Sequence, residues 1–530
     1  MIFAANFTTE RFFIASKPRF HSDFSVPNIR NVLGFILLIP ASFIFALIST
    51  ILFNIFKRHR IIITAVGLII NSAVIEPLKP AVLFSHKKKY HLLVMKSAIL
   101  LFVSLFFINS ITSAQTAKDF AADWDKRHFS TILPSDLRHA DLKKQLGELK
   151  KIGLKVNEVG KSYAMREIYQ IEWGKGKTKV FMWSQMHGDE PTATPAVLDM
   201  LVYLQANRSK IWVKELENAL TIRVVPMLNP DGAELFQRRN LQYIDINRDA
   251  QDLQTPEGQL LKKLRDEFSP DIGFNLHNQQ SLTTAGNTNK QATISFLTVL
   301  GNAEGITNEG FERNKRICAL MISALNNYIE GHIARYDDEY NPRAFGDRIS
   351  EWGTPVILIE TGELHGKSEM FLVKMNFIAY LTALKSLADK SEKTADAKVY
   401  DNLPRNDSGN IYNYIFRRAN IVNFIENAAP FIADISLNAD RKRASEIAPT
   451  YIREIGDLSI YTGLVEFDAK DFYLVNKNGL LKTGIGGELW FYKKSRKIEW
   501  TAKDFDKTFP PEAIFSNGKW TKGDKLLKQF

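Results

Sequence analysis

The hexapeptide Met-His-Gly-Asp-Glu-Pro at 186–191 is the strongest chemical signal in the sequence. It places His187 and Glu190 three positions apart, between an apolar run and a helical pattern. At such a turn an imidazole nitrogen and a carboxylate oxygen can converge on one metal ion. The pair alone is weak evidence, because a chain with ten histidines gives chance matches and a capped helix start has the same pattern. A metal site therefore requires further ligands.

Two later residues supply candidates in matching positions. His277 follows the apolar run 272–276, and Glu360 ends the apolar run 355–360. Both would lie at the carboxyl ends of strands, where α/β sheets present ligand sites, although a buried structural histidine would also fit His277. Because an unpaired buried carboxylate is costly, Glu360 is expected at the open end of the sheet. Two His and one Glu with an open fourth position are typical of catalytic zinc, and a separate glutamate can deprotonate the bound water.

A third group of polar residues lies between these elements. The turn Asn-Pro-Asp-Gly at 229–232 is followed by Arg238 and Arg239, and then by Asn247 and Arg248. An arginine beside an asparagine on a short loop forms a forked, charge-assisted clamp for a carboxylate. A solvated basic loop is the alternative interpretation.

The elements that must position these residues alternate between strand and helix. Apolar runs separated by helical patterns predict an α/β fold with a mixed, mostly parallel central sheet and helices on both faces. We expect strands at 164–171, 178–186, 220–227, 272–276 and 355–360, and helices at 142–149, 194–204, 257–268, 308–330 and 371–387.

The pattern of apolar and polar residues changes after about residue 390. Residues 389–410 are charged and rich in turn formers, which predicts a linker. Short apolar runs at 458–467, 472–477 and 488–492 follow, separated by Asn-Gly and Gly-Gly turn signals. We therefore expect a small, partly β accessory domain at 405–530, after a first domain at 115–395.

Taken together, the order and context of these motifs resemble the zinc carboxypeptidase (funnelin) family. The resemblance covers roughly residues 130–390 and includes Gly-Lys-Ser at 160–162. It implies a zinc-carboxypeptidase-like fold for residues 115–395 and a metallocarboxypeptidase that hydrolyses the C-terminal peptide bond of a peptide substrate. It also implies one Zn²⁺ per chain.

The resemblance assigns roles residue by residue. The implied zinc ligands are His187, Glu190 and His277, and the implied general base is Glu360, with Glu363 as the fallback. Arg238 would hold the oxyanion, with Arg239 as the alternative. The remaining implied roles are terminal-carboxylate binding by Asn247 and Arg248, and closure over the substrate by Tyr340 or, as second choice, Tyr336.

One departure from the family pattern leaves specificity open. Digestive members carry an arginine before the zinc-ligand glutamate, whereas this chain has Asp189. That favours, as an alternative, a zinc-dependent amidase or deacylase acting on cell-wall peptides or acylated amino acids. A non-catalytic peptide-binding module is a second alternative. Asp347, 13 residues before Glu360, could select a basic side chain or form a structural ion pair.

Composition limits the partners. The net charge of +11 suggests nucleic acid, but residues 1–94 hold eleven Lys and Arg against three acids, which leaves only +3 for the rest. The rest also lacks a nucleic-acid-binding motif, so we expect no nucleic acid partner. The single cysteine, Cys318, excludes an intramolecular disulfide and is expected to be a buried thiol. The oligomeric state stays unassigned.

The N-terminal region predicts export. Residues 95–114 have the form of a signal peptide, with a basic start, a short apolar run and small residues before Gln115. Upstream, residues 32–56 are apolar and long enough to span a membrane, and a basic flank follows. We expect translation to start at Met95, so that residues 1–94 are not in the native protein and the mature chain is periplasmic or secreted. Membrane contact, through residues 32–56, is expected only if that segment is retained.

Overall fold

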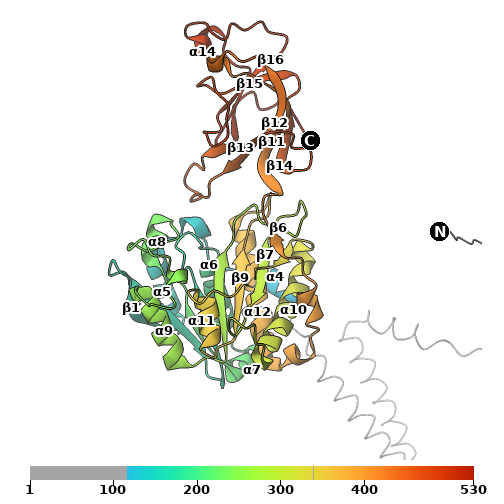
Figure 1. Cartoon of the computed structure of the whole chain (residues 1–530). Coiled ribbons are helices and arrows are strands. Elements are labelled where there is room, and N and C mark those ends of the chain that lie inside the picture. The colour runs from blue at the N-terminus through green and yellow to red at the C-terminus, as the bar shows by residue number, and fades with distance from the viewer. Residues whose placement is uncertain (1–115, 338) are drawn as a thin grey trace, which may run out of the picture. The chain divides into compact units, whose positions relative to one another are not determined.

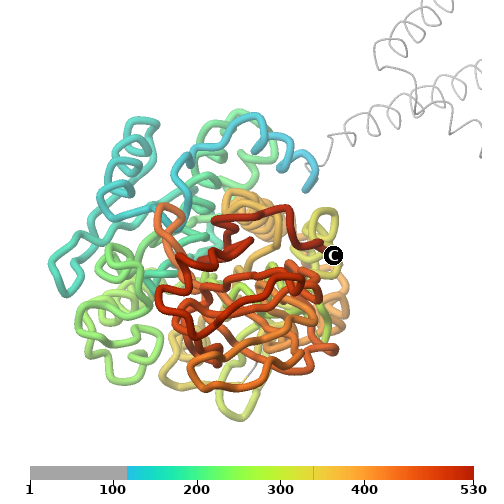
Figure 2. Tube along the Cα trace, turned by 90° about the horizontal axis from the view of Figure 1, so that it is seen from above, coloured from blue at the N-terminus to red at the C-terminus, as the bar shows by residue number. Residues whose placement is uncertain are grey.

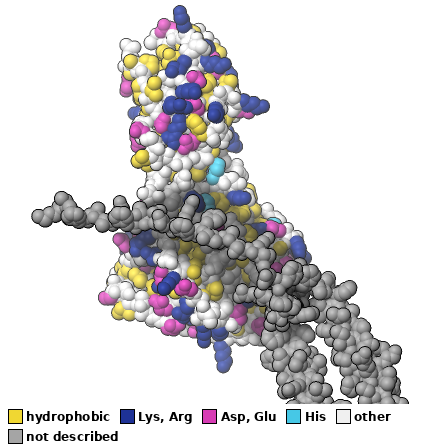
Figure 3. Space-filling model, turned by 90° about the vertical axis from the view of Figure 1, so that its right-hand side faces the viewer, with side chains coloured by type: hydrophobic (Ala, Val, Ile, Leu, Met, Phe, Trp, Pro, Cys, Tyr) yellow, Lys and Arg dark blue, Asp and Glu magenta, His cyan; other side chains and the backbone are white. Residues whose placement is uncertain are grey.

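The computed structural model describes residues 116–337 and 339–530. The predicted upstream segment (1–94) and signal peptide (95–114) lie outside these residues. The described residues belong to one unit, which contains two large sheets and one sheet of two short strands. On the face in Figure 3, Lys and Arg side chains are interspersed with Asp and Glu.

The first sheet has eight strands in the order β1-β2-β4-β3-β5-β9-β7-β8. Neighbours β4, β3, β5 and β9 run parallel, as do β7 and β8, whereas β1, β2 and the β7–β9 pair are antiparallel. The predicted mixed, mostly parallel sheet is confirmed. The strands are β1 (Lys155–Lys161), β2 (Glu167–Gly174), β3 (Thr178–Ser184), β4 (Leu220–Val225), β5 (Ile272–Asn278), β7 (Ile294–Thr298), β8 (Ile333–Arg335) and β9 (Val356–Thr361).

Helices cover both faces of this sheet (Figure 1). Alternate strand residues face opposite ways: Val180 and Met182 pack into one core, and Phe181 and Trp183 into the other. The first core includes α4 (Ala117–Lys126), α5 (His139–Lys151), α6 (Ala193–Ala206), α7 (Ile211–Ala219), α10 (Glu309–Ile329) and α12 (Glu369–Asp389). The second includes α9 (Pro256–Phe268) and α11 (Phe345–Glu351).

Helix α12 is long and apolar enough to cross a membrane, the only such helix among the described residues. Its apolar window is 72% buried inside the protein, and Phe377, Leu381 and Leu384 belong to the first core. A core helix of a water-soluble domain has these properties, so α12 is explained by packing on the sheet.

The second sheet is built from residues after 410, drawn orange to red in Figure 2. Its own core contains the buried rings of Phe416, Phe467, Phe491 and Phe515. The predicted β character of the C-terminal region is confirmed. The strands are β11 (Ile411–Ile421), β12 (Phe431–Ala439), β13 (Thr450–Gly456), β14 (Thr462–Asp468), β15 (Phe472–Val475), β16 (Leu489–Lys493), β17 (Ala513–Ser516), β18 (Lys519–Lys522) and β19 (Lys528–Gln529).

Part of the segment expected to be a linker is packed. Tyr400, in α13 (Lys398–Asp401), is buried, and its hydroxyl accepts from the amide N of Thr298 in β7 at 3.0 Å. Farther on, β10 (Asn406–Asp407) pairs with β6 (Thr284–Ala285). The segment 389–410, predicted to be a linker, is therefore fastened to the first domain by an aromatic side chain and a strand pair.

The β12–β13 loop (440–449) is also fastened to the first domain. The Arg443 guanidinium, 3% exposed, donates to the carbonyls of Ser135, Ala233 and Glu234 at 2.8, 2.7 and 2.9 Å. Two of these carbonyls end α8 (Pro230–Leu235), where unpaired acceptors favour a cation. Ser445 adds a hydrogen bond from its hydroxyl to Asp136 at 2.6 Å.

We expect Arg443→Ala to lower the free energy of unfolding by about 2 to 4 kcal/mol, because buried carbonyls lose a charged donor. Denaturant unfolding measures this change. Lys442→Ala, one residue earlier and exposed, is the matched control and should stay within about 0.5 kcal/mol of the parent. Equal stability of both variants would show that the loop is not fastened through Arg443.

Candidate metal centre and active site

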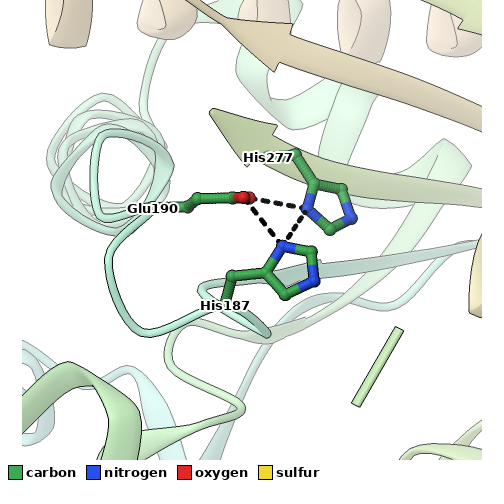
Figure 4. Close-up of side chains that lie close together, drawn as sticks. All are labelled: His187, Glu190 and His277. Atoms are coloured by element: carbon green, nitrogen blue, oxygen red, sulfur yellow. Dashed lines mark hydrogen bonds and ion pairs between the residues drawn. The ribbon is translucent and has the colours of Figure 1, made fainter. Parts of the chain in front are cut away.

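His187, Glu190 and His277 converge on one point (Figure 4). Their candidate ligand atoms lie within 4.8 Å of one another, and all three residues are buried. Glu190 Oε1 lies 2.8 Å from His187 Nδ1, Glu190 Oε2 lies 2.7 Å from His277 Nδ1, and the two Nδ1 atoms are 3.2 Å apart. Ligands at zinc-bond lengths in a tetrahedral site are about 3.3 Å apart, so these separations suit one zinc ion.

Local structure explains the convergence. His187 follows β3, and Glu190 precedes α6, so the turn between strand and helix carries both. Gly188 permits this turn, since an added Cβ would lie 1.9 Å from the backbone carbon of Gly232. His277 lies in β5 and pairs in register with Glu360 of β9.

The hydrogen bonds of His187 favour a cation at this point. Its Nε2 lies 3.0 Å from Asp245 Oδ1, which sets Nε2 as the protonated nitrogen and leaves the Nδ1 lone pair facing Glu190. Burial lowers the pKa of the imidazole, but the Glu190 and Asp245 carboxylates outweigh it and raise the pKa to about 9. The surroundings therefore stabilise positive charge, which a zinc ion supplies. The donor set fits zinc.

Glu360 lies beside this group without belonging to it. Its carboxyl is buried in β9 and lines the same cavity as His187 and Glu190. Burial raises the pKa of Glu360 well above its usual range, and the Glu190 carboxylate raises it further. A carboxyl with raised proton affinity next to a metal site suits a proton acceptor.

Arg238 points at the same centre. Its Nη1 lies 3.2 Å from both His187 Nδ1 and Glu190 Oε1, and its Nε donates to Asp245 at 2.9 Å. The alternative, Arg239, is exposed, and its guanidinium donates to the Tyr243 carbonyl at 3.0 Å. The structure thus brings Arg238, and not Arg239, to the metal centre.

Asn247 and Arg248 lie on the cavity wall. The Asn247 side-chain oxygen accepts from the amide of Phe345 at 2.8 Å, and Arg248 Nη1 donates to the Asn247 carbonyl at 2.7 Å. The Asn247 side chain is thus held by α11, and the Arg248 guanidinium by the backbone of its neighbour.

The two tyrosines differ in position. Both line the cavity, but the Tyr340 hydroxyl bonds to Glu351 at 2.9 Å, on the outside of the molecule. The charge of Glu360 and burial both raise the pKa of Tyr336, which places Tyr336 next to the candidate base. In this structure the second choice, Tyr336, lies closer to the chemistry. Glu363, the fallback for Glu360, is exposed beyond β9 and does not line the cavity.

Sequence reasoning missed Asp245, which fixes the His187 ring. Its position in the sequence, two residues before Asn247, was the only indication, and in the structure it caps a one-turn helix. The motif at 229–232 has a structural role instead: Asp231, fully buried, accepts from Arg166 at 2.6 Å and Ser162 at 2.8 Å. These contacts link the Gly-Lys-Ser segment to the loop that carries the arginines.

Asp347 lines the cavity near Arg248. Burial raises the pKa of Asp347 from 3.8 to about 6, and the charge of Arg248 opposes this shift. The folded state then holds a proton that the unfolded chain releases, so stability falls as pH rises from about 4 to about 6.

Asp347→Asn removes this ionisation. We expect the variant to gain about 1 to 2 kcal/mol of unfolding free energy over wild type between pH 4 and 7, after allowance for screening of a partly exposed group. Denaturant unfolding at four pH values measures it. Asp252→Asn, an exposed carboxylate outside the cavity, should show no such gain. A stability difference that does not change with pH would contradict the assignment.

Comparisons with known proteins agree with this centre. Residues 141–306 match the family model described as zinc carboxypeptidase. Carboxypeptidase 2 of Trichophyton rubrum is 35% identical over 101 residues, which are 19% of this chain and 18% of the relative. Carboxypeptidase E of Caenorhabditis elegans is 28% identical over 185 residues, 30% of this chain and 37% of the relative.

Among solved structures, a metallo-carboxypeptidase from Pseudomonas aeruginosa in complex with (2-guanidinoethylmercapto)succinic acid matches with a TM-score of 0.39 at 18% identity. The match covers 47% of this chain and 69% of that one. The chain spans about a fifth of the length of the fungal relatives it matches.

The family match over residues 141–306 contains all three residues of the His-Glu-His triad, so this part of the chain is similar to the zinc carboxypeptidases at the metal centre itself. The triad His187, Glu190 and His277 is its zinc-binding site, with one zinc per chain.

Proposed function

We propose that this protein is a zinc metallocarboxypeptidase that hydrolyses the C-terminal peptide bond of peptides. The observation that carries the proposal is the placement of Glu360 beside the zinc-binding triad, in one cavity with Asn247 and Arg248. A metal, a base and a carboxylate clamp are the parts that this reaction needs.

The chain's own residues divide the work. Zinc, when bound by the triad, acidifies water and polarises a carbonyl. Glu360 accepts a proton from the attacking water and then delivers it to the leaving amine. Arg238 faces the negative charge that develops on the carbonyl oxygen in the transition state. Asn247 and Arg248 bind the terminal carboxylate of the peptide, which selects the last residue of the chain.

The cavity supports a peptide of several residues. Its volume is about 1370 Å³, and its walls come from both the first domain and the C-terminal region. Tyr336 lines the same cavity as Glu360 and would cover the scissile bond, while Tyr340 is bonded to the exposed Glu351.

The test compares one peptide in two forms, with a free C-terminus and with a C-terminal amide. We expect the peptide with a free C-terminus to lose single residues and the amidated peptide to be hydrolysed very little. Mass spectrometry of the products measures both. Equal hydrolysis of both forms would contradict a carboxylate clamp. Peptides of the same series that differ only in their C-terminal residue also show which terminal residue the enzyme prefers.

A zinc-dependent amidase or deacylase is a second candidate, favoured by Asp189. Its side chain lines the cavity, where a digestive family member would have an arginine. Faster hydrolysis of acylated amino acids or cell-wall fragments than of free peptides would support this candidate over the first. Binding of free peptide without any turnover would support the non-catalytic module.

We further propose that the protein is exported, on the strength of the signal-like segment 95–114. The intact mass of the native protein tests this. A mass matching a chain that starts near Gln115 is expected, whereas a chain that retains residues 32–56 would be membrane-anchored.

A further inference from the structure

The β12–β13 loop of the C-terminal region forms part of the catalytic cavity. Asp440 and Arg441 of this loop line the same cavity as His187 and Glu360. Arg443, two residues on, is buried against the first domain and fixes the loop by three hydrogen bonds. The β12–β13 loop is therefore a fixed part of the cavity wall.

Arg441 is the cation of this loop that faces the catalytic carboxylates. It is exposed, and no hydrogen bond or ion pair joins it to another of the residues that the structure describes. It lines the same cavity as Asp189 and Glu360, so its charge lies in the cleft that holds the candidate base. A guanidinium without a fixed partner at the mouth of a cleft is available to a ligand carboxylate.

Arg441 and Arg248 line the same cavity from different parts of the chain. Arg248 belongs to the first domain, whereas Arg441 belongs to the β12–β13 loop of the C-terminal region. A peptide whose terminal carboxylate is held by Arg248 has its preceding residues in the rest of this cavity, one wall of which carries Arg441. Arg453 of β13 lines the same C-terminal wall and adds positive charge.

We propose that Arg441 is a specificity-determining residue, supplied by the C-terminal domain, that binds an acidic side chain of the peptide upstream of the scissile bond. The proposal rests on the carboxypeptidase function. It assigns the C-terminal domain a part in substrate selection.

The test uses pairs of peptides that differ only by Glu or Gln at one of the three positions before the scissile bond. Wild type should have a kcat/KM about 2- to 10-fold higher for the Glu peptide at one of these positions, the range for a partly solvated ion pair. Arg441→Gln should abolish the ratio, and Arg441→Glu should reverse it. Lys442→Gln, the neighbouring exposed cation outside the cavity, should keep the wild-type ratio.

A second readout separates this inference from the function on which it rests. The affinities of the same peptide pairs for zinc-loaded Glu360→Gln, with and without Arg441→Gln, are measured by titration. Hydrolysis with a Glu/Gln ratio that Arg441→Gln leaves unchanged would overturn the role of Arg441 and keep the carboxypeptidase. Absence of hydrolysis, with a binding preference that Arg441→Gln abolishes, would overturn the carboxypeptidase and keep the role of Arg441.

Discussion

Glu360→Gln is expected to keep zinc and peptide binding and to lose turnover. The carboxyl accepts the proton of the attacking water, and an amide cannot, so kcat should fall by at least about 10² to 10⁴-fold. Burial already raises the pKa of Glu360, which means that the fold does not depend on its charge, and the variant should fold. Turnover, inhibitor affinity and zinc content of the purified variant measure the result.

Glu363→Gln is the matched control. Glu363 lies three positions beyond Glu360, is exposed and does not line the cavity, so its loss should be nearly silent. Wild-type turnover in Glu360→Gln, together with loss of turnover in Glu363→Gln, would mean that the base has been placed in the wrong register along this strand. Full turnover in both would exclude β9 as the source of the base.

His277→Ala is expected to lose most of the zinc while the protein remains folded. The residue supplies one of three ligand atoms at the centre, and the remaining pair of donors would hold zinc far more weakly. Metal analysis of the purified protein measures the content, which should fall from one zinc per chain to well below half. Near-stoichiometric zinc would remove His277 from the site.

Two controls make this result specific. Asp245→Asn keeps all three ligands but replaces the carboxylate that orients His187 with a neutral amide, so zinc affinity should fall by only about 10- to 100-fold. His139→Ala removes a buried histidine that bonds the Glu167 carbonyl, far from the triad, and should keep full zinc. A zinc loss in His139→Ala equal to that in His277→Ala would indicate general unfolding.

The sequence could predict the buried elements because their residues repeat in strand or helix periods. The apolar run 272–276 is β5, the run 355–360 matches β9, and the helical pattern 257–268 is α9 within one residue. Strand β1 was missed because most of its residues are exposed. The predicted strand at 164–171 is shifted from β2 by three residues, since a turn at Met165 with φ of 64° interrupts it.

The site shows the same division. Spacing and resemblance together pointed to His187, Glu190, His277 and Glu360, because His277 and Glu360 lie at strand ends and the other two in the turn between a strand and a helix. What sequence could not give is which strand ends are neighbours: the register of β5 with β9 places His277 beside Glu360. Arg441 was beyond prediction, since its place in the cleft depends on contacts between two sheets far apart in the chain.

Zinc titration of the metal-free protein tests the central claim most directly. The purified chain is stripped with a chelator, zinc is added in steps, and hydrolysis of a peptide with a free C-terminus is followed. We predict that activity is absent without metal, rises linearly and reaches its maximum at one equivalent of zinc, because one triad binds one ion. Hydrolysis by the metal-free protein, or activity that requires a second equivalent of zinc, would contradict the account.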